Sequence, residues 1–328
     1  MGISGIIPFL SSKAPQVVRP LPSFDLIGGK RVFIDCSTIL RRSLHASMRT
    51  VLDRFKYQFK AVRDSNVYID TSAMKDEIMN CSVHPLSVLN KSLQSVDHKG
   101  GIEATFVLGP FEDTAGKNKH PNDPSYINIL DIKNGDLVKN LKDYCCGSES
   151  IKFYPSLSHK DINHISQKLI DQFAKVQIRN PEIVKKCVEF CTDEDDYVIS
   201  DDTNVLAYGA PNVIRDFLGS KQPNTINHKE MLEALEFNRD QFVDFCILLG
   251  YKHSVRIPDI GPYRAYSIIK RFYSLERFFK SVLYQELFKT KKGAELLSKY
   301  DMTLDEFTDK YFNLEQRYDL KLGVVEVR

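Results

Sequence analysis

Aspartates follow two short apolar runs in this chain, a position that suits carboxylates that bind metal ions. Asp35 ends the run at 32–34, and Asp201 and Asp202 follow the run at 197–199. Ligand sites of open α/β sheets lie beyond the carboxyl ends of the strands. Clustered carboxylates suit hard cations such as Mg²⁺, and two such ions can hold the attacking and leaving oxygens of a phosphodiester. Each aspartate also has a structural interpretation, because aspartate after a strand commonly caps a helix or forms a turn.

These carboxylates need a sheet to bring them together, and the pattern of apolar residues predicts one. Strands are predicted at 32–34, 104–110, 197–199 and 211–217. Helices are predicted at 38–62, 134–145 and 165–176 and after Pro181. We predict no regular element between 63 and 100, a loop at 111–126, and only helices beyond 217. Strands that alternate with helices, followed by helices alone, indicate an α/β sheet domain and then an α-helical part.

The composition is that of a globular chain in a reducing compartment. The 328 residues are 42% hydrophobic and 27% charged, and the net charge is only +2. A nucleic-acid surface therefore depends on local clusters of basic residues. The seven cysteines show no zinc-type spacing, which fits an intracellular location, nuclear or cytoplasmic. No apolar stretch is long enough to span a membrane, so no membrane partner is expected.

Several segments follow one another in the order of a known family. They are MGISGIIPFLSSKAP at the start, GKRVFIDCSTIL after it, and SDDTNVLAYGAPNVIRDF at 200–217. The most specific segment is QFVDFCILLGYKHSVRIPDIGPYRAYSIIKRF at 241–272. Together they resemble the flap endonuclease / XPG family of structure-specific 5′ nucleases over most of the chain.

The resemblance implies a fold and a cofactor. The expected fold is a PIN-like α/β nuclease core with a central, mostly parallel sheet at 1–218, followed at 219–328 by a helical region. That helical region would contain the family's helix–two-turn–helix, which grips duplex DNA. Mg²⁺ is the expected cofactor if any metal site survives. Carried over by position, Asp35, Asp201 and Asp202 match the family's metal-binding carboxylates, and Glu182 matches another when the alignment is given a one-residue gap.

The family's other carboxylates are replaced by side chains that bind Mg²⁺ poorly or not at all, at Leu108, Val184, Asn204 and Lys252. Leucine and valine have no ligand atom, and the amide of asparagine is a weaker, neutral ligand. An ammonium at the last position would repel a divalent cation and pair with the remaining carboxylates. The resemblance therefore implies no catalytic residues in this chain, unless the alignment is shifted or Glu112 and Asp113 substitute for the lost ligands.

The expected nucleic-acid contacts lie in the helix–two-turn–helix, at Gly261, Arg264, Lys270 and Arg271. Asp259 replaces the first glycine of the family's G-I-G hairpin and adds a charge that repels phosphate. The resemblance places the family's basic arch at 110–130, but the prolines of this segment disfavour a regular helix. The last residues before Arg328 do not resemble a sliding-clamp-binding motif.

These observations favour a catalytically inactive flap-endonuclease-like protein that acts as a nucleic-acid-binding or protein-interaction scaffold. Its partners would be duplex DNA or RNA, or other proteins. The alternative is an active Mg²⁺-dependent structure-specific endonuclease or 5′ exonuclease with a rebuilt metal site. A third hypothesis is an interaction protein that has lost nucleic-acid contact. The first hypothesis predicts that Asp35, Leu108, Asp202 and Lys252 converge at one end of the sheet, with the Lys252 ammonium paired to an aspartate.

Overall fold

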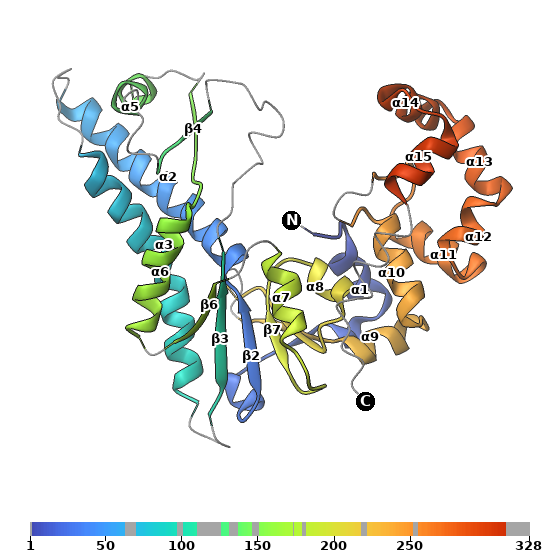
Figure 1. Cartoon of the computed structure of the whole chain (residues 1–328), viewed down its shortest axis with the longest axis horizontal. Coiled ribbons are helices and arrows are strands. Elements are labelled where there is room, and N and C mark those ends of the chain that lie inside the picture. The colour runs from blue at the N-terminus through green and yellow to red at the C-terminus, as the bar shows by residue number, and fades with distance from the viewer. Residues whose placement is uncertain are drawn as a thin grey trace. The chain divides into compact units, whose positions relative to one another are not determined.

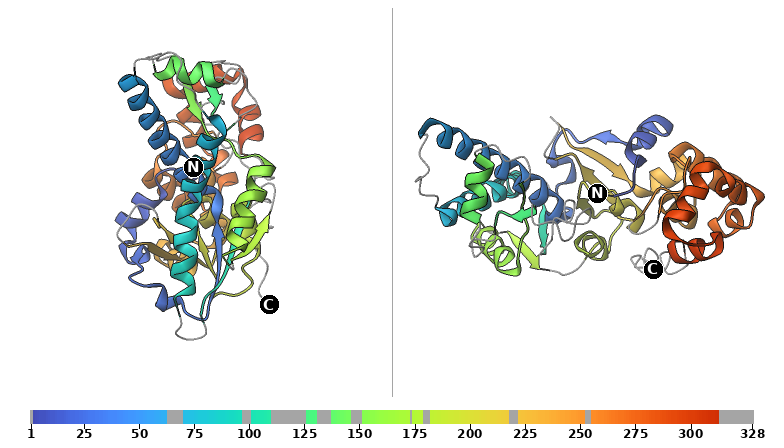
Figure 2. Two further views of the ribbon diagram at one scale, coloured as in Figure 1. Left: turned by 90° about the vertical axis from the view of Figure 1, so that its left-hand side faces the viewer. Right: turned by 90° about the horizontal axis from the view of Figure 1, so that it is seen from above.

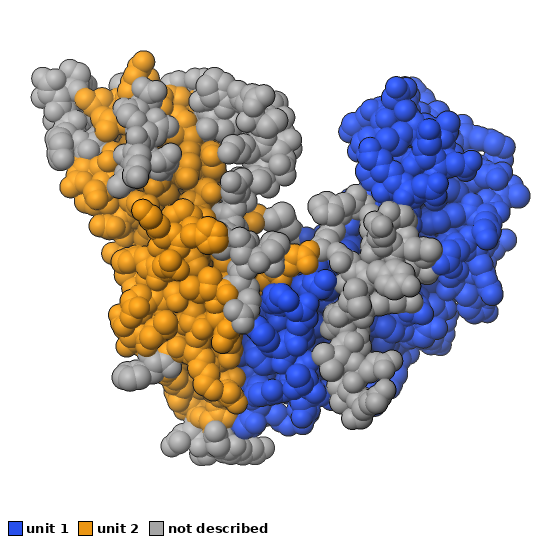
Figure 3. Space-filling view, viewed as in Figure 1, with its two compact units in different colours: residues 1–33, 184–328 blue, residues 34–183 orange. Residues whose placement is uncertain are grey.

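The computed structural model describes residues 2–62, 70–96, 101–109, 126–130, 137–145, 151–172, 174–178, 182–217, 222–251 and 255–312. The chain forms two compact units (Figure 3): unit 1 contains Met1–Phe33 and Val184–Arg328, and unit 2 contains Ile34–Ile183. The expected domains 1–218 and 219–328 divide the chain elsewhere. That division follows the regions of the family rather than the packing, and it stays a prediction.

Unit 1 contains one side of the main sheet. Its strands lie in the order β1-β9-β8-β7-β2, with the bounds β1 Arg19–Pro20, β9 Asn224–Asn227, β8 Asn212–Arg215, β7 Tyr197–Ile199 and β2 Arg31–Asp35. Strands β7 and β8 are parallel, with Val198 opposite Val213, whereas β9 is antiparallel to β8. The predicted strands at 32–34, 197–199 and 211–217 are therefore confirmed as β2, β7 and β8.

Unit 2 begins inside β2, and its strands lie in the order β2-β3-β6. Strands β3 (Glu103–Leu108) and β6 (Lys175–Ile178) are parallel, with Leu108 opposite Ile178. Helices α2 (Cys36–Val62) and α3 (Thr71–Gln94) run alongside each other (Figure 1). The unit is completed by α5 (Leu137–Cys145), α6 (His159–Ile170) and a small parallel sheet of β4 (Tyr126–Asn128) and β5 (Lys152–Tyr154). The central, mostly parallel sheet expected from the sequence is thus present.

Two sequence-based expectations about unit 2 were wrong. No element was expected at 63–100, but α3 fills most of that stretch, and its apolar residues recur at helical spacing from Met74 to Leu93. Asp70 caps this helix by accepting hydrogen bonds from the backbone N–H groups of Ser72 and Ala73. The helix predicted at 165–176 ends at Ile170, and its last part becomes strand β6.

The helices after β9 belong to unit 1 and follow one another closely, whereas α1 (Ile6–Lys13) lies at the start of the same unit. They are α9 His228–Leu235, α10 Arg239–Leu248, α11 Pro262–Phe272, α12 Leu275–Phe279, α13 Val282–Lys289, α14 Lys291–Tyr300 and α15 Leu304–Tyr311. The right-hand view of Figure 2 shows the last of them, in orange to red, gathered into one group. Among the described residues beyond 217, only strand β9 departs from the expectation of helices, and it is a short strand between β1 and β8 with three polar residues. Among the described residues, no helix is long and apolar enough to cross a membrane.

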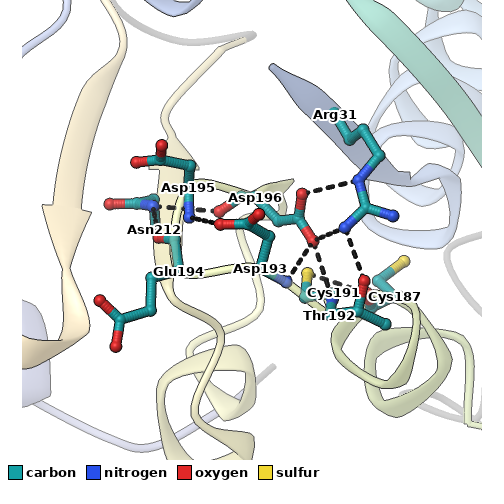
Figure 4. Close-up of polar contacts among 9 residues, drawn as sticks. All are labelled: Arg31, Cys187, Cys191, Thr192, Asp193, Glu194, Asp195, Asp196 and Asn212. Carbon is teal, nitrogen blue, oxygen red and sulfur yellow. Dashed lines mark hydrogen bonds and ion pairs between the residues drawn. The ribbon is translucent and has the colours of Figure 1, made fainter. Parts of the chain in front are cut away.

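A buried ion pair fixes the start of β2 beside the turn that leads into β7 (Figure 4). Arg31 Nε donates to Asp196 Oδ1 at 2.9 Å, and the Asp196 side chain is 3% exposed. The other oxygen of Asp196 accepts the backbone N–H groups of Thr192 at 2.8 Å and Asp193 at 3.0 Å. Because all these partners saturate the buried carboxylate, the turn is held in one conformation next to the strand.

Candidate functional site

Asp35 ends β2 and lies at the first turn of α2, where it is fully buried. Its Oδ1 accepts the backbone N–H of Ser37 at 3.0 Å and also the Ser37 hydroxyl, and its Oδ2 accepts the Thr38 hydroxyl at 3.2 Å. This is the bonding of an N-terminal helix cap, and a negative charge is favoured at that end of a helix. The structural interpretation of Asp35 therefore has direct geometric support.

Leu108, which the resemblance aligns with the family's second carboxylate, ends β3 and is completely buried. Its neighbours along the strand, Phe106 and Val107, are also 0% exposed, so this end of the strand contributes to the apolar core. Glu182 lies just before α7 (Ile183–Glu189), with an exposed side chain and a φ of 71°. Val184 lies in the first turn of α7 and is partly buried.

Asp201 and Asp202 follow β7, as the sequence predicted, and each makes local hydrogen bonds. Asp201 Oδ1 accepts the backbone N–H of Asp216 at 2.7 Å, which ties the end of β7 to the residue after β8. Asp202 Oδ1 accepts the backbone N–H of Asn204 at 2.9 Å. Asn204 is the first residue of α8 (Asn204–Tyr208), and its buried Oδ1 has no hydrogen-bond partner.

Gly2 packs directly against Asp202 and Thr203. A Cβ on Gly2 would lie 2.3 Å from Thr203 Oγ1 and 2.7 Å from Asp202 Oδ1. The φ of Gly2 is +126°, which L-residues with a side chain rarely adopt. The Thr203 hydroxyl also donates to the Ile3 carbonyl at 3.2 Å. The first residues of the chain thus lie against Asp202 and Thr203, in a position that only glycine allows.

A partly buried arginine, which the sequence did not single out, holds the other end of α8. Arg239 donates to the Ala207 carbonyl at 2.5 Å and contacts His228 Nε2 at 3.3 Å. Burial lowers the pKa of Arg239 to about 10. Burial also lowers the pKa of His228 to about 3, with the Arg239 charge as the second cause. Both residues position α8, and through it the segment that carries Asp202 and Asn204.

The expected nucleic-acid contacts lie at the start of α11 and within this helix. Gly261 is the N-cap of α11 and makes no side-chain cap, and a Cβ placed on it would meet nothing within 4 Å. Arg264 NH1 donates to the Asp259 carbonyl at 3.3 Å. Lys270 forms an ion pair with Glu236 at 2.6 Å, so the charge of Lys270 is already partly neutralised. The sequence alone could not reveal this pair. Arg271 is exposed in the last turn of the same helix.

Asp259, which the resemblance aligns with the first glycine of the family's hairpin, adopts a left-handed backbone conformation with φ 62°. Aspartate is among the few residues with a side chain that tolerate this region. Its carboxylate pairs with the Lys292 ammonium of α14 at 2.7 Å. The hydrogen bond to Asp259 raises the pKa of Lys292. The repulsive charge expected from the sequence therefore has an opposite charge beside it.

Some predicted positions lie outside the described residues. These are Lys252, the alternative ligands Glu112 and Asp113, and the arch-like segment up to residue 125. The predicted pairing of Lys252 with an aspartate therefore stays a prediction. Within the part of the chain that the structure describes, no three His, Cys, Asp or Glu residues are grouped so that they could hold a metal ion.

Comparison with known proteins identifies the family. The family model of the XPG I-region matches residues 185–251. Flap endonuclease 1 of Lodderomyces elongisporus is 30% identical over 302 residues, which cover 85% of this chain and 68% of that protein. Flap endonuclease 1 of Theileria parva is 27% identical over 302 residues, which cover 89% of this chain. The chain belongs to the flap endonuclease / XPG family.

Solved structures show the same fold. The catalytic core of Rad2 in complex with DNA substrate aligns with 96% of this chain and 94% of its own, with a TM-score of 0.51 and 16% identity. The eukaryotic junction-resolving enzyme GEN-1 aligns with 99% of this chain and 65% of its own, with a TM-score of 0.51 and 15% identity. The chain spans about half the length of the Theileria relatives, 56% and 54%.

Proposed function

We propose that this chain is a catalytically degenerate member of the flap endonuclease family that binds nucleic acid, or holds protein partners, without cutting. One observation carries the proposal: the position of the family's second carboxylate is Leu108, which is fully buried at the end of β3 and has no ligand atom. A metal site cannot be completed there without replacing a core residue.

The remaining carboxylates support the same conclusion. Asp35 and Asp202 each accept local hydrogen bonds at the start of a helix, which gives both a role without metal. Asn204 offers only a neutral oxygen at the next position. The described residues therefore do not fit two Mg²⁺ ions, which need several carboxylate oxygens in octahedral geometry. The clamp on the attacking and leaving oxygens would be missing.

Nucleic-acid binding is supported by the start of α11. The open space at Gly261 allows close approach of a phosphate, and the N-terminal N–H groups of the helix favour an anion. Arg264 adds a positive charge in the first turn. The alternative, an active nuclease with a rebuilt site, is favoured by the retention of Asp35 and Asp202 after their strands.

The test combines duplex binding and metal binding on the purified chain. We expect modest binding to duplex DNA that weakens steeply with added salt, because phosphate contacts release counterions. We expect calorimetry to detect no binding of Mg²⁺ or Mn²⁺ that depends on Asp35, so wild type and Asp35→Ala should give the same result. Metal binding that depends on Asp35 would favour the active nuclease. Absence of duplex binding even at the lowest salt would leave the protein-interaction scaffold as the function.

A further inference from the structure

We propose that Asp259 and Lys292 form an ion pair that a nucleic-acid phosphate opens. In the free protein Asp259 holds the Lys292 ammonium. On binding, a backbone phosphate of duplex DNA takes the place of the Asp259 carboxylate on that ammonium. This inference rests on the proposed nucleic-acid-binding function and adds α14 to the binding surface.

The two charged groups come from different elements and meet at the turn before α11. Asp259 lies two residues before the N-cap Gly261, and Lys292 is the second residue of α14. Their charged atoms are 2.7 Å apart, and their side chains are 44% and 67% exposed. A pair so exposed is weak, because water competes for both charges. A second anion can therefore replace the carboxylate at little cost.

The position of Lys292 is fixed by close packing. A Cβ on the next residue, Gly293, would lie 2.3 Å from the Leu287 carbonyl oxygen and 2.6 Å from the Phe288 Cα. The start of α14 therefore lies directly on the end of α13, as only glycine allows. The Thr290 side chain caps α14 by accepting the Gly293 N–H. Lys292 thus extends from a rigid helix start, which keeps its ammonium near the turn.

Other positive groups lie close by in the chain, and together they suit a polyanion. Lys291 precedes Lys292 and is exposed. The Arg264 guanidinium lies against the backbone of Asp259, to whose carbonyl it donates at 3.3 Å. Asp259 is the negative charge beside these groups, and a phosphate that replaces its carboxylate leaves the Lys292 ammonium paired with an anion. The fitting partner is the sugar–phosphate backbone of a duplex, bound without regard to sequence.

Binding titrations with Asp259→Asn test the pair. Asparagine tolerates the left-handed backbone of this position, so the turn is retained. We expect this variant to bind duplex DNA more tightly than wild type does. The slope of log affinity against log salt should be steeper by about 0.9. Its affinity should therefore increase about threefold more than that of wild type when the salt falls from about 200 to about 50 mM. Adding Lys292→Met to Asp259→Asn should remove this gain.

Glu286→Gln is the matched control. It frees Lys289 from a pair of the same 2.7 Å length in the same helical group, with the same change in net charge. An equal gain in duplex affinity by this control would overturn the inference. So would a gain by Asp259→Asn that persists when Lys292→Met is added. In either case, duplex binding by wild type would still support the proposed function. Failure of wild type and Asp259→Asn alike to bind at low salt overturns both the inference and the nucleic-acid-binding part of the proposed function.

Discussion

The backbone N–H of Asn204 donates a hydrogen bond to Oδ1 of Asp202 at 2.9 Å. A carboxylate that the family resemblance assigns to a metal therefore stabilises the start of α8 in this chain. Asp35 has the same kind of bond to Ser37 at the start of α2. If these aspartates stabilise the folded chain as helix caps, replacing either of them should lower the free energy of unfolding. Replacing a carboxylate whose only role is to bind a metal ion would not lower it.

Asp35→Ala is expected to lower the free energy of unfolding by about 1–3 kcal/mol, because buried donors at Ser37 and Thr38 lose their acceptor. Asp35→Asn, which keeps one acceptor oxygen, should lose less. Urea unfolding without metal measures both. A cluster of carboxylates built for a cation behaves in the opposite way, because removing one relieves repulsion. Greater stability of Asp35→Ala would therefore contradict the capping role.

Leu108→Asp is expected to lower stability by about 3 kcal/mol or more, because it places a charge in the core. Leu108→Asn is the uncharged control of similar size. We expect Mg²⁺ to restore neither variant in thermal unfolding, because Asn204 still offers only a neutral ligand. Selective rescue of Leu108→Asp by Mg²⁺ would show that the neighbouring ligands are intact, in support of the active nuclease.

The fold was largely predictable where local pattern and tertiary structure agree. The strand at 197–199 was predicted with its observed bounds, because a short apolar run is followed by a carboxylate pair. Helix α3 was missed because polar residues and Pro85 obscure its apolar spacing, although that spacing is present in the buried residues. The pairs Asp259–Lys292 and Arg239–His228 join residues far apart in sequence, so no local pattern could indicate them.

Stability should fall as the pH drops below about 6.5, the pKa of histidine in an unfolded chain. Burial lowers the pKa of His228 to about 3 in the folded chain, so the unfolded state binds more protons between these values. The contribution of His228 to the free energy of unfolding is complete above about pH 6.5. It is lost as the pH falls from there to about 3, at up to about 1.4 kcal/mol per pH unit. His228→Gln should flatten the decline in unfolding experiments between about pH 7.5 and about pH 5.5. An unchanged slope would contradict the low pKa.

Gly261→Ala is expected to change stability by about 0.5 kcal/mol or less, because its φ of −96° suits alanine and the added Cβ meets no atom. The methyl group should nevertheless weaken duplex binding if a phosphate approaches the start of α11. Gly293→Ala is the contrasting variant, and its clash with the Leu287 carbonyl should lower the melting temperature. Normal duplex binding by Gly261→Ala would place the contact elsewhere.

Cleavage by the purified chain tests the central claim most directly. A 5′-flap substrate and a plain duplex are incubated with Mg²⁺ or Mn²⁺, beside Asp35→Ala as the control for contaminating nuclease. The account predicts no cleavage above the level of Asp35→Ala with either metal, because it assigns the position of the second carboxylate to the buried Leu108. Robust cleavage by the wild-type chain that Asp35→Ala abolishes would contradict it and establish an active nuclease with a rebuilt site.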